Sequence, residues 1–290
     1  MDENFRQYLL DGQRAGMRYV LAQPPGAPRG VAGSQMGSRA GSSLEFMDHR
    51  EYIPGDDLRR IDWSAYARSD KLTVKLYREE VCPHLDILID TSRSMALAGT
   101  AKAQATLSLA ALLAEAAENA GYSHCAWLAG EGCRKMPNGA AEPALWEGID
   151  FEYAAGPAES LQRLPPAWRP RGIRVLISDL LWLGDPVGML SIFSRKATSV
   201  VVVQLLARAD VDPPRHGNVR LVDSETHLHQ EIFIDAAAQR RYRRALARHQ
   251  QNWHRACRQV GAVMTTVVAE QLVRDWRLDE LLALEVLKVA

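Results

Sequence analysis

The sequence predicts an α/β fold with a mostly parallel central sheet flanked by helices, preceded by an N-terminal helix and a strand-rich extension. Apolar runs of strand length occur at residues 85–90, 173–177 and 200–206, and buried parallel strands are typically apolar throughout. Helical patterns alternate with these runs, which favours right-handed crossovers and a sheet covered on both faces. With 47% hydrophobic and 24% charged residues, the composition is that of an ordinary globular protein with a substantial core.

Three regions are expected along the chain. Residues 1–43 hold a helix at 3–21, interrupted by Gly12 and Gly16, and then a flexible arm rich in glycine and proline. Residues 44–84 form a segment of alternating acids and arginines with a turn at Pro54, followed by a strand at 72–77 that has one polar face. Within this segment Trp63 is expected in the core. Residues 85–290 form the α/β domain.

The remaining elements of the α/β domain follow from periodicity. Helices are expected at 101–120, where alanine and leucine dominate, weakly after residue 156, and at 186–196, 235–260 and 278–287. Further strands are expected at 125–128, at 232–234 as a short edge strand, and at 263–268 as the last strand. Residues 130–147 form a hairpin or an irregular excursion. Gly261 follows the longest amphipathic pattern at the position typical of a helix end.

Polar side chains end two of the predicted buried strands. Asp90, Ser92 and Ser94 follow the first strand with a spacing of two, and Asp179 ends the strand at 173–177. Ligands bind at the carboxyl ends of strands in open α/β sheets, and hard cations such as Mg²⁺ prefer carboxylate and hydroxyl oxygens. The alternative for the first group is helix capping, and for Asp179 it is a role as a turn residue.

The charge and cysteine content exclude several classes of protein. Thirty-five basic and thirty-five acidic residues give a formal charge of zero, so no global field attracts nucleic acid or an anionic membrane. The four cysteines show no C-x-x-C pair, which speaks against a zinc site or a disulfide framework and favours the cytoplasm. No apolar run reaches the roughly 20 residues of a membrane span, and no secretory signal is apparent at the start. We therefore expect a soluble cytoplasmic protein that does not span a membrane.

Several arginines lie off the apolar stripe of the helix expected at 235–260. They are Arg240, Arg241, Arg243, Arg244 and Arg248. A solvated helix face explains them better than nucleic-acid binding.

The chain resembles a bacterial family catalogued as domain of unknown function 58, in which a signature segment precedes a von Willebrand factor A-like domain. The resemblance rests on the D-x-S-x-S pattern after a buried strand and on a signature with many fixed positions. That signature reads Glu45-Phe46, Arg50-Glu51-Tyr52, Pro54-Gly55-Asp56-Asp57, Arg59, Ile61-Asp62-Trp63, Ala67-Arg68 and Glu79-Glu80. The resemblance as a whole covers roughly residue 33 to the C-terminus.

The resemblance implies a metal-ion-dependent adhesion site that holds Mg²⁺ or Mn²⁺ and leaves one position for a carboxylate of a partner. Asp90, Ser92 and Ser94 would supply the first loop and Asp179 the third. Residues 156–161 stand at the place of the second loop without its usual Gly-Thr pair, so Ser160 or Glu159 would be a substitute there.

The resemblance further implies a non-enzymatic partner of a MoxR-type AAA+ ATPase in protein assembly or maturation. One alternative is a metal-dependent hydrolase, but Asp90 has neither a D-x-D pair nor a paired histidine beside it. Another alternative is a metal-free scaffold that binds its partner through residues 44–68.

Overall fold

The computed structural model of the chain describes residues 3–22, 44–79, 83–182, 184–213, 217–224 and 228–290. The chain divides into two compact units, one made of residues 1–27 and 83–290 and the other of residues 28–82. The first unit is therefore built from two separate stretches of sequence. The glycine- and proline-rich arm expected up to residue 43 lies outside the described residues from residue 23 onward.

A six-stranded sheet forms the centre of the first unit. Its strands, in spatial order, are β11 (Val263–Val268), β8 (Ser199–Leu206), β7 (Ile173–Ser178), β4 (His84–Asp90), β5 (Ser123–Ala129) and β6 (Cys133–Lys135). Neighbouring strands are parallel except for β6, which runs antiparallel to β5. The predicted α/β fold with a mostly parallel central sheet is confirmed.

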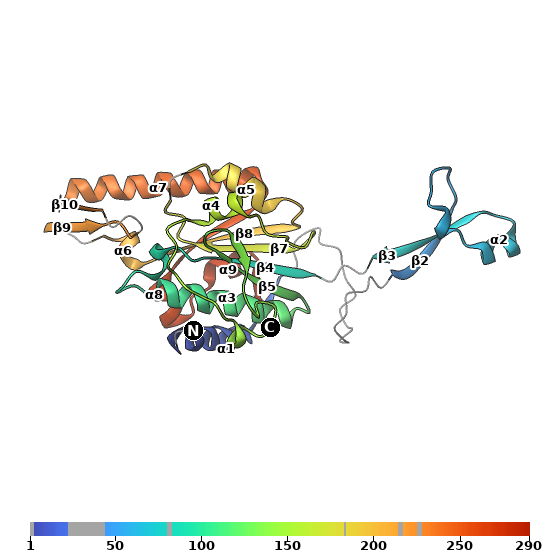
Figure 1. The fold of residues 1–290 in the computed structure, drawn as a ribbon, viewed down its shortest axis with the longest axis horizontal. Coiled ribbons are helices and arrows are strands. Elements are labelled where there is room, and N and C mark those ends of the chain that lie inside the picture. Colours follow the sequence, from blue (N-terminus) through green and yellow to red (C-terminus); the bar gives the residue numbers. More distant parts are fainter. Residues whose placement is uncertain (1–2, 23–43, 80–82, 183, 214–216, 225–227) are drawn as a thin grey trace. The chain divides into compact units, whose positions relative to one another are not determined.

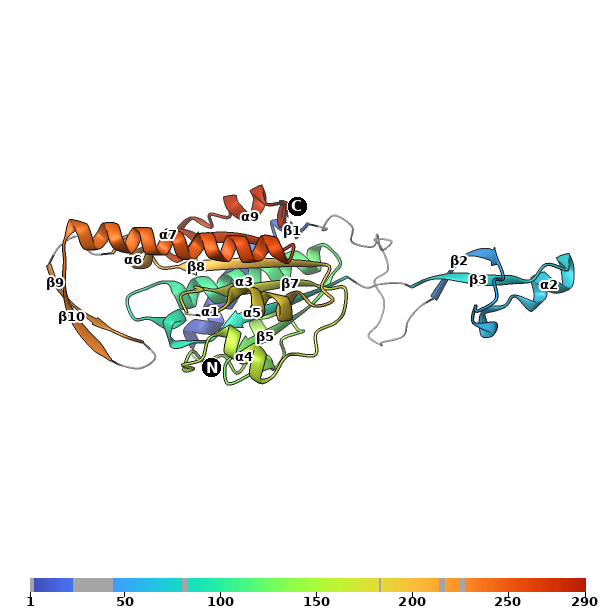
Figure 2. The same ribbon diagram turned by 90° about the horizontal axis from the view of Figure 1, so that it is seen from above.

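Helices cover both faces of this sheet (Figures 1 and 2). On one side lie α1 (Glu3–Gly16), α3 (Lys102–Asn119), α8 (Ala269–Asp275) and α9 (Asp279–Ala283), and on the other lie α4 (Pro157–Arg163), α5 (Pro186–Ser194) and α7 (Ala236–Gln259). Successive side chains of β4 point to opposite faces of the sheet and so contribute to a hydrophobic core on each face. Ile87 and Ile89 pack toward α3, whereas Leu88 packs toward α5 and α7. None of the helices in the described part of the chain combines the length and apolar character needed to cross a membrane.

Helix α3 is buried on nearly all sides because α1 covers the face that it turns away from the sheet. Gly12 does not interrupt α1. Instead it lets the two helices touch, since a Cβ atom at this position would lie 2.1 Å from the carbonyl oxygen of Ser108. The N-terminal helix ends at Gly16, and residues expected to continue it form strand β1 (Tyr19–Leu21).

Two smaller sheets complete the first unit and correct two predictions. The segment expected as an edge strand at 232–234 belongs to β10 (His229–Ile234), which forms a separate hairpin with β9 (Gly217–Val222) after the short helix α6 (Arg208–Val211). The helix expected at 278–287 is shorter, because the chain leaves α9 to form β12 (Leu287–Val289), antiparallel to β1. The strand at 263–268 is therefore not the last.

The second unit is an antiparallel pair of strands, β2 (Leu44–Glu51) and β3 (Thr73–Glu79), joined by a 3-10 turn at Leu58–Arg60 and helix α2 (Trp63–Ser69). Asp62 caps α2 and lies 2.7 Å from His49 Nε2 and 3.5 Å from Lys75 Nζ. The expected arginine-carboxylate pairing is present between Arg50 and Asp56 at 2.8 Å. The expectation for Trp63 is wrong, because 62% of this residue is exposed.

Candidate functional site

The loop that follows β4 is fixed by hydrogen bonds around Asp90. This residue is fully buried, and its carboxylate accepts hydrogen bonds from the backbone N–H of Ser92 at 2.9 Å and from Ser178 Oγ at 2.6 Å. Thr91 Oγ1 donates to the carbonyl of Ala129 at the end of β5. The neighbouring strands β5 and β7 thus hold the loop from both sides at the carboxyl edge of the sheet.

The Ser92 and Ser94 hydroxyl oxygens lie 3.0 Å apart. Ser92 occupies the N-cap position of the 3-10 turn Arg93–Ala96, yet its side chain makes no capping hydrogen bond there. The Asp90 carboxylate does accept a hydrogen bond from the backbone at the start of this turn. Helix capping therefore explains part of the role of Asp90, but it does not explain the Ser92 hydroxyl.

Asp179 reaches the same edge from β7 and contacts a buried lysine. Its Oδ2 atom lies 2.9 Å from Lys102 Nζ, while its Oδ1 atom accepts from the N–H of Leu181. The Lys102 ammonium also lies 2.9 Å from Asp210 Oδ2 of α6 and is only 1% exposed. Lys102 therefore bridges two carboxylates at the start of α3.

Negative charge exceeds positive charge at this edge. Burial, and next the charge of Asp179, raise the pKa of Asp90 to about 7. Burial opposes the charge of Lys102, but Asp179 and Asp210 outweigh it, so the pKa of Lys102 is raised. Asp179 and Asp210 thus share the single ammonium group of Lys102, and the carboxyl group of Asp90 lies at the same edge, so a further cation would be stabilised here.

A cavity of about 650 Å³ opens over these side chains. Its walls come from the loop after β4, the start of α3, the loop before α4, the end of β7, α6 and the end of β9. The lining residues that carry charges or hydroxyls are Ser92, Ser94, Lys102, Glu159, Asp179, Asp210, Asp223 and Ser224.

Of the five predicted site residues, the structure brings four to this edge. Ser160 is buried in the first turn of α4, where its hydroxyl donates to the carbonyls of Gly130 at 2.5 Å and Gly156 at 3.1 Å. Its neighbour Glu159 lines the cavity and pairs with Arg163 at 2.5 Å. Within the described residues, no group of three or more histidine, cysteine, aspartate or glutamate side chains is placed to hold a metal ion, so any such site depends on the hydroxyls as well.

Comparison with known proteins defines the family. Residues 48–252 match the family described as "Protein of unknown function DUF58". The chain belongs to the DUF58 family. Uncharacterized proteins of Mycobacterium bovis and Mycobacterium tuberculosis are each 27% identical to this DUF58 chain over 265 residues, which is 85% of this chain and 80% of theirs. An uncharacterized Mycobacterium avium protein is 32% identical over 126 residues, covering 42% of this chain and 70% of its own.

Two solved structures align with this DUF58 chain at low similarity. BatB from Bacteroides thetaiotaomicron aligns over 70% of this chain and 96% of its own, with 10% identity and a TM-score of 0.37. An aerotolerance-related membrane protein from Bacteroides fragilis aligns over 68% and 99%, with 12% identity and a TM-score of 0.36. Similarity this low carries no argument about the function of the chain.

Several polar residues of the DUF58 site were not predicted, among them Lys102, Ser178, Gln204 and Asp210. Lys102 is the first residue and the only lysine of an alanine-rich helix whose middle turns are apolar, and a lone lysine in such a helix is a signal for a buried partner. Ser178 ends β7 as Asp90 ends β4, whereas Gln204 lies inside β8, which continues to Leu206. Gln204 donates from Nε2 to the carbonyl of Asp179 at 3.0 Å and so fixes the loop after β7.

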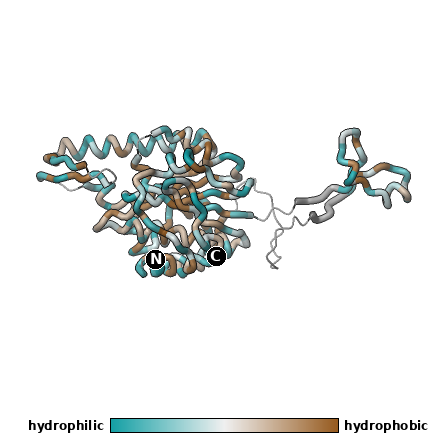
Figure 3. Tube along the Cα trace, viewed as in Figure 1, coloured by the Kyte–Doolittle hydropathy of each residue, from teal (hydrophilic) through white to brown (hydrophobic). Residues whose placement is uncertain are grey.

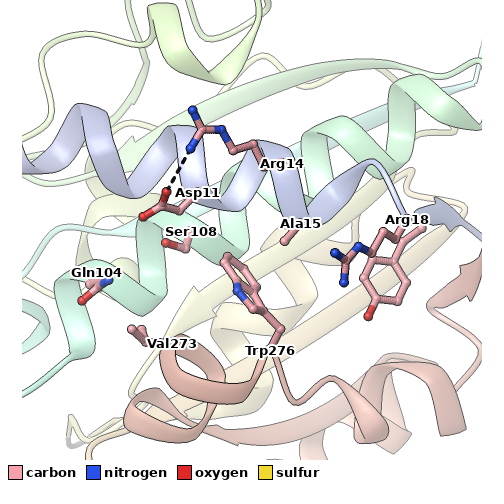
Figure 4. A pocket seen from close by; sticks show the side chains of 9 residues that line it. Asp11, Arg14, Ala15, Arg18, Gln104, Ser108, Val273 and Trp276 are labelled. Carbon is pink, nitrogen blue, oxygen red and sulfur yellow. Dashed lines mark ion pairs between the residues drawn. The ribbon is translucent and has the colours of Figure 1, made fainter.

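A second cavity of this DUF58 chain, of about 290 Å³, lies between α1, α3 and α8 (Figure 4). Asp11 and Arg14 of α1 form an ion pair beside this cavity, with Arg14 Nη1 3.9 Å from Asp11 Oδ1, and Trp276 lines the cavity as well. None of the residues around Asp90 lines it.

Proposed function

We propose that this DUF58 chain is a non-enzymatic adaptor whose first unit resembles a von Willebrand factor A domain. In this proposal a divalent cation, Mg²⁺ or Mn²⁺, is held at the carboxyl edge of the sheet and recruits an acidic residue of a protein partner. The observation that carries the proposal is that Ser92, Ser94 and Asp179 line one cavity, with Asp90 buried behind them and bonded to the backbone of Ser92.

The donor set fits a hard cation. Ser92 and Ser94 offer neutral hydroxyl oxygens and Asp179 offers a carboxylate beside the cavity, the mixture that Mg²⁺ prefers. The buried carboxylate of Asp90 adds negative charge behind them, where it bonds to Ser92 and Ser178. The excess of carboxylates over ammonium groups favours a bound cation for a separate, electrostatic reason. A bound Mg²⁺ supplies a coordination position for a carboxylate oxygen from outside. Ser160 is not part of this proposed ligand set, because its hydroxyl already donates to the carbonyls of Gly130, after β5, and of Gly156, before α4.

The geometry gives less support to a hydrolase. A general base must reach a water or a substrate, but Asp90 is fully buried and Asp179 is paired with Lys102. The proposed role is therefore binding. From the family resemblance, the proposed partner is a MoxR-type AAA+ ATPase or its client protein, and the proposed process is protein assembly or maturation.

A metal-free scaffold is a second candidate because of one observation. Lys102 places a permanent positive charge between Asp179 and Asp210, within the wall of the cavity. In that case the ammonium group replaces the cation, and the site is a rigid polar surface.

Calorimetric titration of the full chain with Mg²⁺ or Mn²⁺ separates the two candidates. The adaptor proposal expects binding by the wild type, its loss in Asp90→Asn, and unchanged binding in Asp275→Asn, which alters an exposed aspartate elsewhere. Association with the purified MoxR-type ATPase is expected to require the metal and to fail in EDTA. Absence of metal binding by the wild type would rule out the cation and favour the scaffold.

A further inference from the structure

Helix α7 carries an unusual concentration of one charge. Its 24 residues include seven arginines and no aspartate or glutamate, although the whole chain has a formal charge of zero. Solvated helices usually mix both signs, because i to i+4 pairs of opposite charge stabilise a helix and pairs of like charge destabilise it. The composition of α7 therefore has no explanation in the stability of the helix itself.

Five of the arginines form one line along the helix. At about 100° per residue, they fall within a sector of about 80°, opposite the buried residues Trp253, Ala256 and Cys257. We call this set the arginine stripe, and it consists of Arg240, Arg244, Arg248, Arg255 and Arg258, all exposed. The helix is about 36 Å long at 1.5 Å per residue.

No acidic side chain in the described part of the chain neutralises the arginine stripe. Arg243, outside the stripe, pairs with Asp212 at 2.7 Å. Among the described residues, no acidic side chain lies within 4.0 Å of a stripe arginine. Figure 3 shows the part of α7 nearest the β9–β10 hairpin as mostly hydrophilic. The stripe is thus available to carboxylates of another molecule, which arginine binds through two parallel hydrogen bonds.

Two exposed apolar side chains lie on the hairpin that precedes the stripe. Strand β10 leads into α7 through Asp235, which caps the helix. In the register of the hairpin, Val222 and Phe233 lie at opposite ends of one face, with Arg220 and Glu231 between them, and their exposed fractions are 58% and 65%. Val222 also lines the cavity beside Asp179. The hairpin therefore connects the arginine stripe with the proposed binding site.

We propose that the arginine stripe and the Val222–Phe233 face of the hairpin form a docking surface for an acidic protein segment that also carries apolar side chains. Charge complementarity selects the acidic partner, and the exposed valine and phenylalanine favour a protein over a phosphate backbone, which offers nothing apolar to bury. The inference deepens the proposed function, since it describes the partner that would reach the cavity, but docking on the stripe requires no metal ion.

The test measures fluorescence anisotropy of three labelled probes with the full chain in EDTA. The first is a peptide in which pairs of glutamates alternate with leucine and phenylalanine, the second is single-stranded DNA of matched charge, and the third is phosphatidylglycerol vesicles. The wild type is expected to bind the peptide most tightly. Arg240→Gln/Arg244→Gln/Arg248→Gln is expected to weaken peptide binding by about tenfold. The matched control Arg6→Gln/Arg195→Gln/Arg274→Gln removes the same charge from other surfaces and is expected to leave peptide binding unchanged.

Phe233→Ser separates a protein partner from a polyanion. This substitution is expected to lower the affinity for the peptide and to leave the affinity for DNA unchanged. No variant is expected to lose thermal stability, because the altered side chains are exposed. The proposal is overturned by failure of the wild type to bind the peptide, by equal loss in the control, or by tighter binding of DNA or vesicles. Since EDTA is present throughout, these outcomes are independent of metal binding in the calorimetric experiment.

Discussion

Lys102 Nζ lies 2.9 Å from Asp179 Oδ2 inside the α/β unit, although 77 positions separate the two residues in the chain. The contact joins the first turn of α3 to the loop after β7, and Asp210 adds α6 to the same ammonium group. A single buried side chain therefore fixes three elements around the candidate site.

Replacement of Lys102 by methionine is expected to lower the free energy of unfolding by about 3 to 5 kcal/mol, because loss of one member of a buried ion pair leaves the other uncompensated. Urea denaturation at neutral pH measures this difference. Lys196→Met, at an exposed position, is the control and is expected to change stability little. A loss in Lys102→Met no greater than that of the control would contradict a structural role for the bridge.

The raised pKa of Asp90 predicts that the free energy of unfolding depends on pH when EDTA keeps the protein free of metal ions. Its pKa is about 7 in the folded chain against 3.8 ordinarily, so between these values the folded state binds more protons than the unfolded state. Stability from this group is fully present below pH 3.8 and is lost as the pH rises through 7, by at most about 1.4 kcal/mol per pH unit.

Asp90→Asn removes the titrating group, and the difference in stability between variant and wild type is therefore expected to change between pH 5 and pH 8. Urea denaturation across this range gives the comparison. A constant difference would show that Asp90 titrates normally in the folded protein.

Ser94→Ala is expected to weaken Mg²⁺ or Mn²⁺ binding by about tenfold if its hydroxyl is a ligand, because one of few protein oxygens is lost. Ser191→Ala removes an exposed hydroxyl that bonds only within α5, and it is expected to leave the affinity unchanged. Calorimetry on both variants compares them. Equal affinities would exclude Ser94 from the ligand set.

Gly12→Ala is expected to destabilise the chain by about 1 to 3 kcal/mol, since the added methyl group must push α1 away from α3. Gly184→Ala provides the control, because the nearest atom to its added Cβ lies 3.7 Å away, on the Trp182 side chain. Thermal unfolding of the two variants is the measurement. Similar midpoints would mean that the two helices can separate at little cost.

The sequence predicted the elements whose signal is local. Strands β4, β7, β8 and β11 are apolar runs, and α3 and α7 are long enough for their periodicity to be clear. The strands β1, β9 and β12 were missed because each is short or exposed, and β2 was missed because alternating charges hide its period. Tertiary pairing stabilises these strands, and pairing partners lie far apart in sequence.

The same distinction applies to the site. Asp90, Ser92 and Ser94 are neighbours in the chain, and the rule that strand ends share an edge brought Asp179 to them. Lys102 and Asp210 joined the site only through folding, as their contact spans more than a hundred positions. Ser160 was chosen by position alone, and its hydroxyl instead ties α4 to the carbonyl of Gly130 after β5.

The pairing of β1 with β12 has a consequence for biosynthesis. Tyr19–Leu21 must wait for Leu287–Val289 before the small sheet that joins them can form. During translation residues 287–289 must therefore leave the ribosome before this contact is possible, and a nascent chain exposes the edge of β1 meanwhile. Such a long-range closure slows folding and makes the incomplete chain a natural substrate for chaperones.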